Sequence, residues 1–225
     1  MPFLGGIALN VETQEYTIIC SVCGCKSNHS IIKNSKADDA PDLDLRPSEP
    51  HRSSMEFWVM QCPECGYCND VLSRSADFDH EYINSDEYKS LGGIDTQNEL
   101  AAKFIKRALV NIKNHQLTEA VQSYLYAAWV FDDINSEDRA KQCRTAAINL
   151  IDNNKEAFSQ NENFIILKAD MLRRCGEFER VITEYSEKKF SKIIFNVISE
   201  FQIKLSKRGD SGVYTSDDIP GITIK

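Results

Sequence analysis

Two cysteine pairs near the start of the chain limit what its first third can fold into. Each pair reads Cys-x-x-Cys-Gly, the first at Cys20 and Cys23 and the second at Cys62 and Cys65. A tight turn between two thiolates lets both reach one metal ion, and the glycine that follows tolerates the positive φ such a turn often requires. Two facing turns of this kind form a four-thiolate shell. The spacing therefore predicts one structural Zn²⁺ ion bound by these four cysteines.

Other uses of these cysteines stay open at this point. The thiols could be buried and reduced, joined as a disulfide, or used as a redox switch, although the βαβ context of thioredoxin-like motifs is missing. Cys68 continues the spacing after Cys65 and partly resembles an iron–sulfur run. Either Cys25 or Cys68 could replace a ligand, but we expect each to lie beside the metal ligands or to be a free thiol. A shell closed by four cysteines leaves no position for a substrate, so the metal is expected to stabilise rather than to catalyse.

The composition is that of a soluble globular protein, with 42% apolar and 27% charged residues in a chain of 225. No apolar run approaches the roughly 18 residues that span a bilayer, so we expect no membrane segment. The first residues lack the pattern of a secretory signal, which makes the cytoplasm the expected location. Thiols stay reduced there, and clustered cysteines more often hold metal than form disulfides.

The distribution of charge argues against nucleic acid as a partner. Residues 1–75 carry six basic and ten acidic side chains, and residues 76–95 carry one basic and six acidic ones. A protein that neutralises many phosphates normally shows a clear basic patch. The cysteine-containing part is acidic, so nucleic-acid binding is an unfavoured alternative.

The sequence changes character near residue 96. Before it, apolar and polar residues alternate over 7–19 and strand-forming residues fill 55–61, whereas 33–54 is polar and contains prolines. These patterns predict strands leading into each cysteine pair and a long irregular loop in the insert 24–61. Residues 74–95 are acidic and contain Gly92-Gly93, so we place the connection between two domains at 76–95.

After residue 96 the apolar residues follow helical spacing. Thr96 with Glu99 has the pattern of a capping box that begins the first helix. The periodicity predicts helices over 96–112, 117–129, 136–153, 161–174, 177–185 and 190–205. The predicted class is α+β, with a zinc-ribbon-like β module (1–75), an acidic linker (76–95), a helical domain (96–208) and an irregular tail (209–225).

The helical half contains spacings typical of tetratricopeptide units, which are helical hairpins of 34 residues. Ala108, Ala120 and Ala127 match the small positions of one unit. Gly176 and Tyr185 match the turn and an aromatic position of a second unit, offset by 61 residues. Such hairpins usually bind peptides. Basic side chains that could favour an acidic partner are Arg173, Arg174, Lys188, Lys189, Lys192, Lys204, Lys207 and Arg208.

The order of these parts resembles an uncharacterised prokaryotic family that joins a Cys₄ zinc ribbon to tetratricopeptide-like helices. The resemblance is carried by the cysteine turns, by Asp44-Leu45-Arg46-Pro47 in the insert, by Gly66-Tyr67 after the second pair, and by Ala127-Ala128-Trp129. It implies metal binding at Cys20, Cys23, Cys62 and Cys65, and it implies no particular activity.

The sequence thus predicts a zinc-binding protein-interaction protein, an adaptor or scaffold, whose partner and oligomeric state are unspecified. A thiol-based redox or metal sensor that uses Cys25 or Cys68 is the alternative. A phosphate-binding loop, a nucleophile elbow, an H-E-x-x-H helix and a dinucleotide fingerprint are all absent from the sequence. We therefore expect no enzymatic activity.

Overall fold

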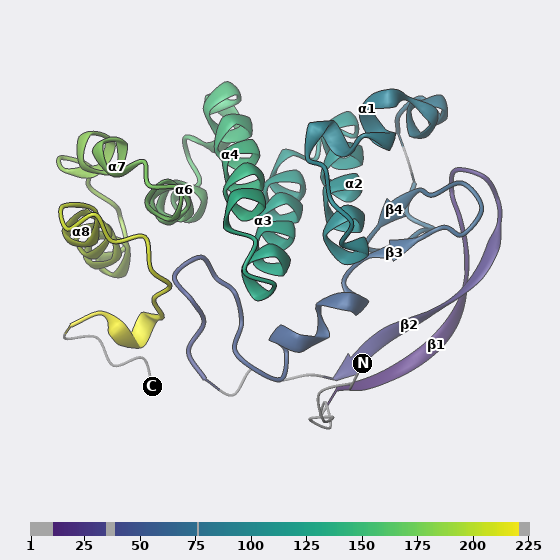
Figure 1. The fold of residues 1–225 in the computed structure, drawn as a ribbon, viewed down its shortest axis with the longest axis horizontal. Coiled ribbons are helices and arrows are strands. Elements are labelled where there is room, and N and C mark those ends of the chain that lie inside the picture. The colour runs from purple at the N-terminus through teal and green to yellow at the C-terminus, as the bar shows by residue number, and fades with distance from the viewer. Residues whose placement is uncertain (1–10, 35–38, 76, 221–225) are drawn as a thin grey trace.

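The computed structural model describes residues 11–34, 39–75 and 77–220. Two small antiparallel sheets near the N-terminus are followed by a row of helices (Figure 1). The predicted α+β class is confirmed.

Each sheet is a two-stranded hairpin. β1 (Glu12–Ile19) pairs with β2 (Lys26–Asn34), and β3 (Met60–Gln61) pairs with β4 (Cys68–Asn69). The strand predicted over 7–19 is confirmed from Glu12 onward, and its residues 7–10 lie outside the described residues. The polar residues of β2 carry no alternating pattern, so the sequence did not predict this strand.

The strand predicted over 55–61 is mostly wrong. A 3₁₀ helix, η1 (Arg52–Phe57), occupies its first half, and only Met60 and Gln61 pair as β3. The Trp58 ring lies 5.2 Å from the Tyr126 ring of helix α3, measured between centroids. Strand propensity reflects the fit of a side chain to a half-buried sheet, and here a helix surface takes the place of that sheet. Of the predicted loop over 33–54, the ends belong to β2 and η1, and the described residues 39–51 between them form neither a helix nor a strand.

The acidic segment predicted as a linker over 76–95 is a packed part of the core. It forms three short helices, which are η2 (His80–Asn84), α1 (Asp86–Lys89) and η3 (Leu91–Gly93). The inward side chains of Ile83, Tyr88 and Leu91 are at most 8% exposed. The acidic side chains of this segment remain on the outside.

The apolar stripes predicted after residue 96 all form helices. They are α2 (Glu99–Lys113), α3 (Leu117–Asp133), α4 (Glu137–Asn153), α6 (Glu162–Arg174), α7 (Phe178–Tyr185) and α8 (Ile193–Ser206). Short α5 (Lys155–Phe158) follows α4, and η4 (Ser216–Asp218) lies in the tail. No helix in the described ranges combines the length and the apolar composition needed to cross a membrane.

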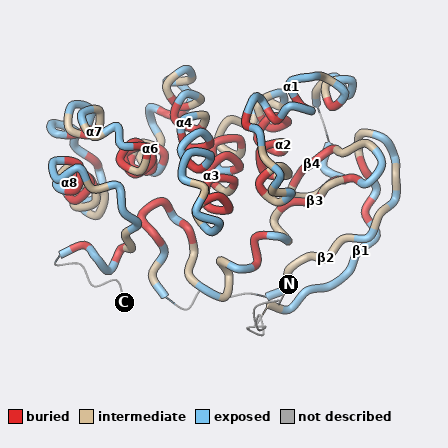
Figure 2. Tube along the Cα trace, in the orientation of Figure 1, coloured by how far each residue is buried: buried red, intermediate tan, exposed pale blue. Residues whose placement is uncertain are grey.

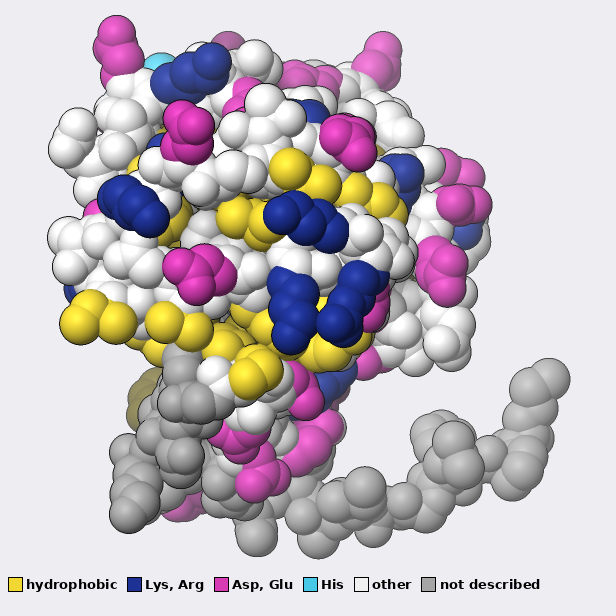
Figure 3. Space-filling view, turned by 90° about the vertical axis from the view of Figure 1, so that its left-hand side faces the viewer, with side chains coloured by type: hydrophobic (Ala, Val, Ile, Leu, Met, Phe, Trp, Pro, Cys, Tyr) yellow, Lys and Arg dark blue, Asp and Glu magenta, His cyan; other side chains and the backbone are white. Residues whose placement is uncertain are grey.

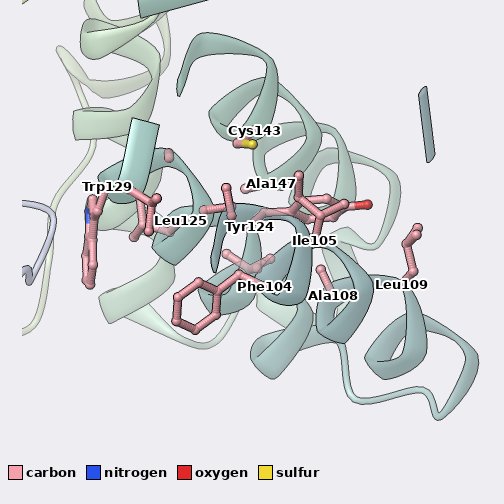
Figure 4. Packing of buried hydrophobic residues seen from close by; sticks show 14 of the residues in the cluster. Phe104, Ile105, Ala108, Leu109, Tyr124, Leu125, Trp129, Cys143 and Ala147 are labelled. Carbon is pink, nitrogen blue, oxygen red and sulfur yellow. The ribbon is translucent and has the colours of Figure 1, made fainter. Parts of the chain in front are cut away.

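Neighbouring helices pack on one another in chain order, α2 on α3 and α3 on α4. Phe104 and Ile105 of α2 meet Tyr124 and Leu125 of α3, with Ala147 of α4 beside them (Figure 4). These side chains are at most 6% exposed. They form the centre of a core that extends to the sheets.

The start of α2 differs from the predicted capping box. Asn98 is the N-cap, and its side chain accepts a hydrogen bond from the backbone N–H of Ala101 at 2.9 Å. The hydroxyl of Thr96 instead accepts from the N–H of Asn98 at 3.0 Å. Asparagine is as good an N-cap as serine or threonine, so residue preference alone did not separate the two candidates.

The loop between the two sheets reaches across to the helices through buried charges. Figure 2 shows that the loop ahead of η1 includes a buried stretch. Within it, Asp44 and Arg46 are 1% and 2% exposed. The indole N–H of Trp129 on α3 donates to Oδ2 of Asp44 at 2.7 Å. Arg144 of α4 and Arg174 of α6 lie 3.7 and 3.8 Å from the same oxygen. The turn at 42–46 therefore ties the N-terminal part of the chain to three helices.

Candidate metal centre

The two cysteine pairs form turns with the same backbone hydrogen bonds. In the first, the N–H of Gly24 donates to the carbonyl of Cys20 at 2.9 Å, and in the second the N–H of Gly66 donates to the carbonyl of Cys62 at 3.0 Å. Both glycines have φ of +74°. An L side chain rarely adopts this conformation, which gives the predicted role of the glycines a structural basis.

Each turn is the tip of a hairpin. β1 enters the first turn and β2 leaves it, while β3 enters the second and β4 leaves it. The first tip is joined to the segment that follows β4 by a hydrogen bond from the N–H of Ser21 to the carbonyl of Leu72, at 2.9 Å. The hairpins therefore hold the two pairs of thiols face to face.

The four predicted cysteines come together. The Sγ atoms of Cys20, Cys23, Cys62 and Cys65 all lie within 4.8 Å of one another, an arrangement that could hold a metal ion. The Cys20–Cys65 and Cys23–Cys62 sulfur distances are 3.8 and 3.5 Å. Cys20 and Cys62 are each 1% exposed, whereas Cys23 is exposed, so one side of the cluster faces solvent.

Burial and hydrogen bonds shift the pKa values of the clustered thiols when no metal ion is bound. Burial raises the pKa of Cys20 and of Cys65. Burial also acts to raise the pKa of Cys62, but the backbone N–H groups of Cys65 and Glu64 donate to its sulfur and bring the pKa down to about 7. Metal binding at neutral pH must therefore release protons from this site.

The two additional cysteines lie outside the four-sulfur cluster. Cys68 is fully buried, its thiol is 3.5 Å from the carbonyl of Gly66, and burial raises its pKa to about 12. Cys25 is partly buried, and burial together with the neighbouring Cys62 thiol raises its pKa. Both sulfurs are therefore mainly protonated at neutral pH.

A tyrosine from the acidic segment supports the second turn and was missed by the sequence analysis. The hydroxyl of Tyr88 donates to the carbonyl of Gly66 at 3.0 Å and accepts from the N–H of Cys68 at 3.1 Å. The side chain is 1% exposed. A single tyrosine among acidic residues carries no sequence signal for this role, because the contact spans 22 residues.

The basic residues singled out for partner binding fall into two groups. Arg173 is fully buried, where it bonds Asp170 at 2.7 Å and Gln202 at 2.6 Å, and Arg174 bonds Asp132 at 3.0 Å. These two arginines belong to the interior. The prediction that they take part in binding an acidic partner is therefore wrong. The exposed basic residues are Lys188, Lys189, Lys192, Lys204, Lys207 and Arg208.

Comparisons of the chain with protein-family models, with curated proteins and with solved structures give no match.

Proposed function

We propose that this protein is a zinc-binding protein-interaction protein, an adaptor or scaffold. One Zn²⁺ ion bound by four cysteines stabilises its N-terminal part, and its helices dock a partner protein. The observation that carries the proposal is the cluster of four sulfurs within 4.8 Å at the tips of two equivalent hairpins. A closed shell of this kind is a structural site, so the function is to be sought on the surface.

The sulfur positions support zinc as the ion. Four sulfurs about 2.3 Å from a tetrahedral Zn²⁺ lie about 3.8 Å from one another. The Cys20–Cys65 distance of 3.8 Å and the Cys23–Cys62 distance of 3.5 Å are close to this value. The paired hairpin tips with their glycines favour a zinc-ribbon-like module.

Buried small residues support tetratricopeptide-like packing of the helices. Ala108, Ala120 and Ala127 have no exposed surface. Gly176, at φ of +78°, follows the end of α6 and turns the chain into α7. The extra helix α4 between the two hairpins makes the array irregular, and such arrays usually bind proteins or peptides.

The end of the helical row formed by α7 and α8 offers a surface for an acidic partner. Lys and Arg side chains lie beside apolar ones on this face (Figure 3). Ile193 at the start of α8 is 82% exposed, and Lys188, Lys189 and Lys192 precede it. Apolar contact flanked by positive charge suits an acidic, apolar segment of a protein.

The alternative functions receive less support. A thiol sensor needs an accessible thiolate, but Cys68 is buried and the pKa of Cys25 is raised. Nucleic-acid binding is disfavoured by the acidic charge of residues 1–95. We propose no enzymatic role, because the sequence contains none of the catalytic motifs sought.

Metal analysis of the purified chain tests the site. We expect one zinc per chain, its loss in Cys62→Ser, and its retention in Cys25→Ser, the matched control. Chelation is expected to unfold the N-terminal part first, because the two small hairpins bury little apolar surface of their own. Near-UV circular dichroism that stays unchanged after full metal removal would argue against this role of the metal.

Crosslinking and pull-down from native cells tests the interaction role. We expect a specific protein that is lost when Lys188, Lys189 and Lys192 are changed to glutamate. Recovery of a small molecule or nucleic acid without any specific protein would count against an adaptor.

A further inference from the structure

Leu45 has an unusual position in the turn of the insert loop. Its flanking residues Asp44 and Arg46 are buried, yet Leu45 is 61% exposed. Its φ is +68°, and the turn is fixed by hydrogen bonds from the N–H of Leu45 to the carbonyl of Asp42 and from the N–H of Asp42 to the carbonyl of Arg46, both at 2.8 Å. Exposed leucines are common, but a leucine held outward in a strained conformation by buried charges points to a functional role.

Two cavities meet at this leucine. The larger, of about 480 Å³, opens broadly to solvent between β2, the insert turn, η1 and α3, and its lining includes Ile31, Leu45, Phe57, Trp58, Tyr126 and Trp129. The smaller, of about 290 Å³, lies between the same turn and helices α3 and α6. Leu45, Tyr126 and Trp129 line both. The larger volume falls in the range of small-molecule sites, roughly 300–1,000 Å³.

Hydrogen bonds hold the aromatic walls in place, and the rings differ in exposure. Trp58 and Tyr126 are partly exposed, whereas Trp129 is 2% exposed. The Trp58 N–H donates to the hydroxyl of Ser54 at 3.1 Å, and the Trp129 N–H donates to Asp44 at 2.7 Å. Tyr126 lies between them, with its ring centroid 5.2 Å from Trp58 and 5.0 Å from Trp129. Both indole donors are occupied, and the His51 ring centroid lies 4.8 Å from that of Trp58. A ligand would therefore be recognised by stacking on the exposed parts of Trp58 and Tyr126.

The charges around the cavities favour an uncharged ligand. Among the described residues, Asp44 is the only carboxylate that lines either cavity, and it faces Arg144 and Arg174. His51 also lines the larger cavity, where its ring packs on that of Trp58. The guanidinium of Arg46 lies 5.9 Å from the Trp129 ring centroid and would repel a cation, while its own charge is paired with Asp133. The charges of Asp44 and Arg46 are already paired with other side chains of the protein, so neither is available to pair with a charged ligand.

We propose that this aromatic cavity binds a small, uncharged molecule with a flat ring system of one or two fused rings, and that Leu45 closes over it. The site is separate from the metal centre and from the docking surface proposed at the α7 and α8 end of the helical row. It does not depend on the adaptor role.

The tryptophan content of the chain allows a direct test, because its two tryptophans, Trp58 and Trp129, both line the cavity. The full zinc-loaded chain labelled with 5-fluorotryptophan would give one ¹⁹F signal for each. The probe is 2-naphthol, with decahydro-2-naphthol as its saturated counterpart and 2-naphthylmethylammonium as its cationic one. We expect 2-naphthol to shift both signals to saturation, and the saturated and cationic molecules to bind about three- to tenfold more weakly.

Variants of Leu45 separate a binding role from a structural one. Leu45→Gly should weaken 2-naphthol binding about tenfold because an apolar contact is lost. Its thermal midpoint should stay unchanged or rise, since glycine adopts positive φ without strain. Val213→Ala trims an exposed apolar side chain in the tail and should change neither quantity. Leu45→Ala gives a second measurement if the glycine variant folds poorly.

Three results would overturn the proposal. The first is the absence of a saturable shift, and the second is equal binding of the saturated probe. The third is ¹⁹F signals that move with protein concentration alone, which would mean that a second copy of the chain covers Leu45.

Discussion

At the scale of single residues, the interior of this protein depends on charges that neutralise one another. Asp44 and Arg46 from the insert loop are buried among Trp129, Arg144 and Arg174 from three helices. Taking such charges out of water is costly, so pairing is required for the fold to tolerate them. These contacts fix where the loop lies against the helices.

Removal of the central carboxylate charge should be strongly destabilising. Asp44→Asn keeps an acceptor for the Trp129 N–H but leaves Arg144 and Arg174 with one carboxylate fewer. We expect a loss of about 3 kcal/mol in the free energy of unfolding, measured by urea denaturation at about pH 8. Asp95→Asn, which changes an exposed carboxylate, should alter it by about 0.5 kcal/mol at most. Equal stabilities of the two variants would contradict the importance of the buried charge.

Asp42 gives the stability a pH dependence of opposite sign to that of a usual ion-paired carboxylate. Burial and the neighbouring Asp44 raise its pKa to about 6. Between about pH 4 and pH 6, the folded chain keeps a proton that the unfolded chain has released, so this stabilising contribution is lost as pH rises through 6. Asp42→Asn cannot titrate. Its stability relative to the unaltered chain should therefore increase by about 1–3 kcal/mol from pH 4.5 to pH 7.5, and a constant difference would disprove the raised pKa.

At the scale of elements, the sequence predicted best where a repeating pattern is long. The apolar stripes of α2 to α8 and the paired cysteine turns recur at fixed spacing, and the structure contains both. Prediction failed over 55–61, and over 76–95 it did not foresee how closely the segment packs. Both segments are short and contact a neighbouring surface. Trp58 packs on Tyr126, and Tyr88 bonds the second cysteine turn. Contacts between residues so far apart in the chain leave no local signal.

The start of α2 offers a matched pair of variants. Asn98 caps the helix directly, whereas Thr96 only supports the N–H of Asn98. Asn98→Ala should cost about 1 kcal/mol of unfolding free energy, and Thr96→Ala clearly less. Urea denaturation of the two variants would decide between the caps, and a larger loss in Thr96→Ala would favour the capping box expected from the sequence.

At the scale of the whole molecule, the structure joins the predicted parts more closely than a linker would. The insert turn reaches three helices, and the acidic segment packs between the second cysteine turn and α2. The tail takes part as well, because Asp42 pairs with Thr215 in an isolated β-bridge. The boundary predicted at 76–95 therefore marks a change in amino-acid composition. Whether the parts on either side of it fold independently is a separate question.

Comparison of the helices alone with the full chain answers that question. In a fragment of residues 96–220, Arg144 and Arg174 lack Asp44, and Trp129 lacks the acceptor for its N–H. We expect the fragment to unfold at a lower urea concentration than the zinc-loaded full chain, with a free energy lower by about 3 kcal/mol or more. Full-chain Asp44→Asn should fall between the two, because it retains the other contacts of the loop. The far-UV dichroism of the zinc-loaded full chain should show one transition, since the buried charges make helix and sheet stability interdependent. A fragment as stable as the full chain, together with two separate transitions in that chain, would mean that the loop lies on the helices without stabilising them.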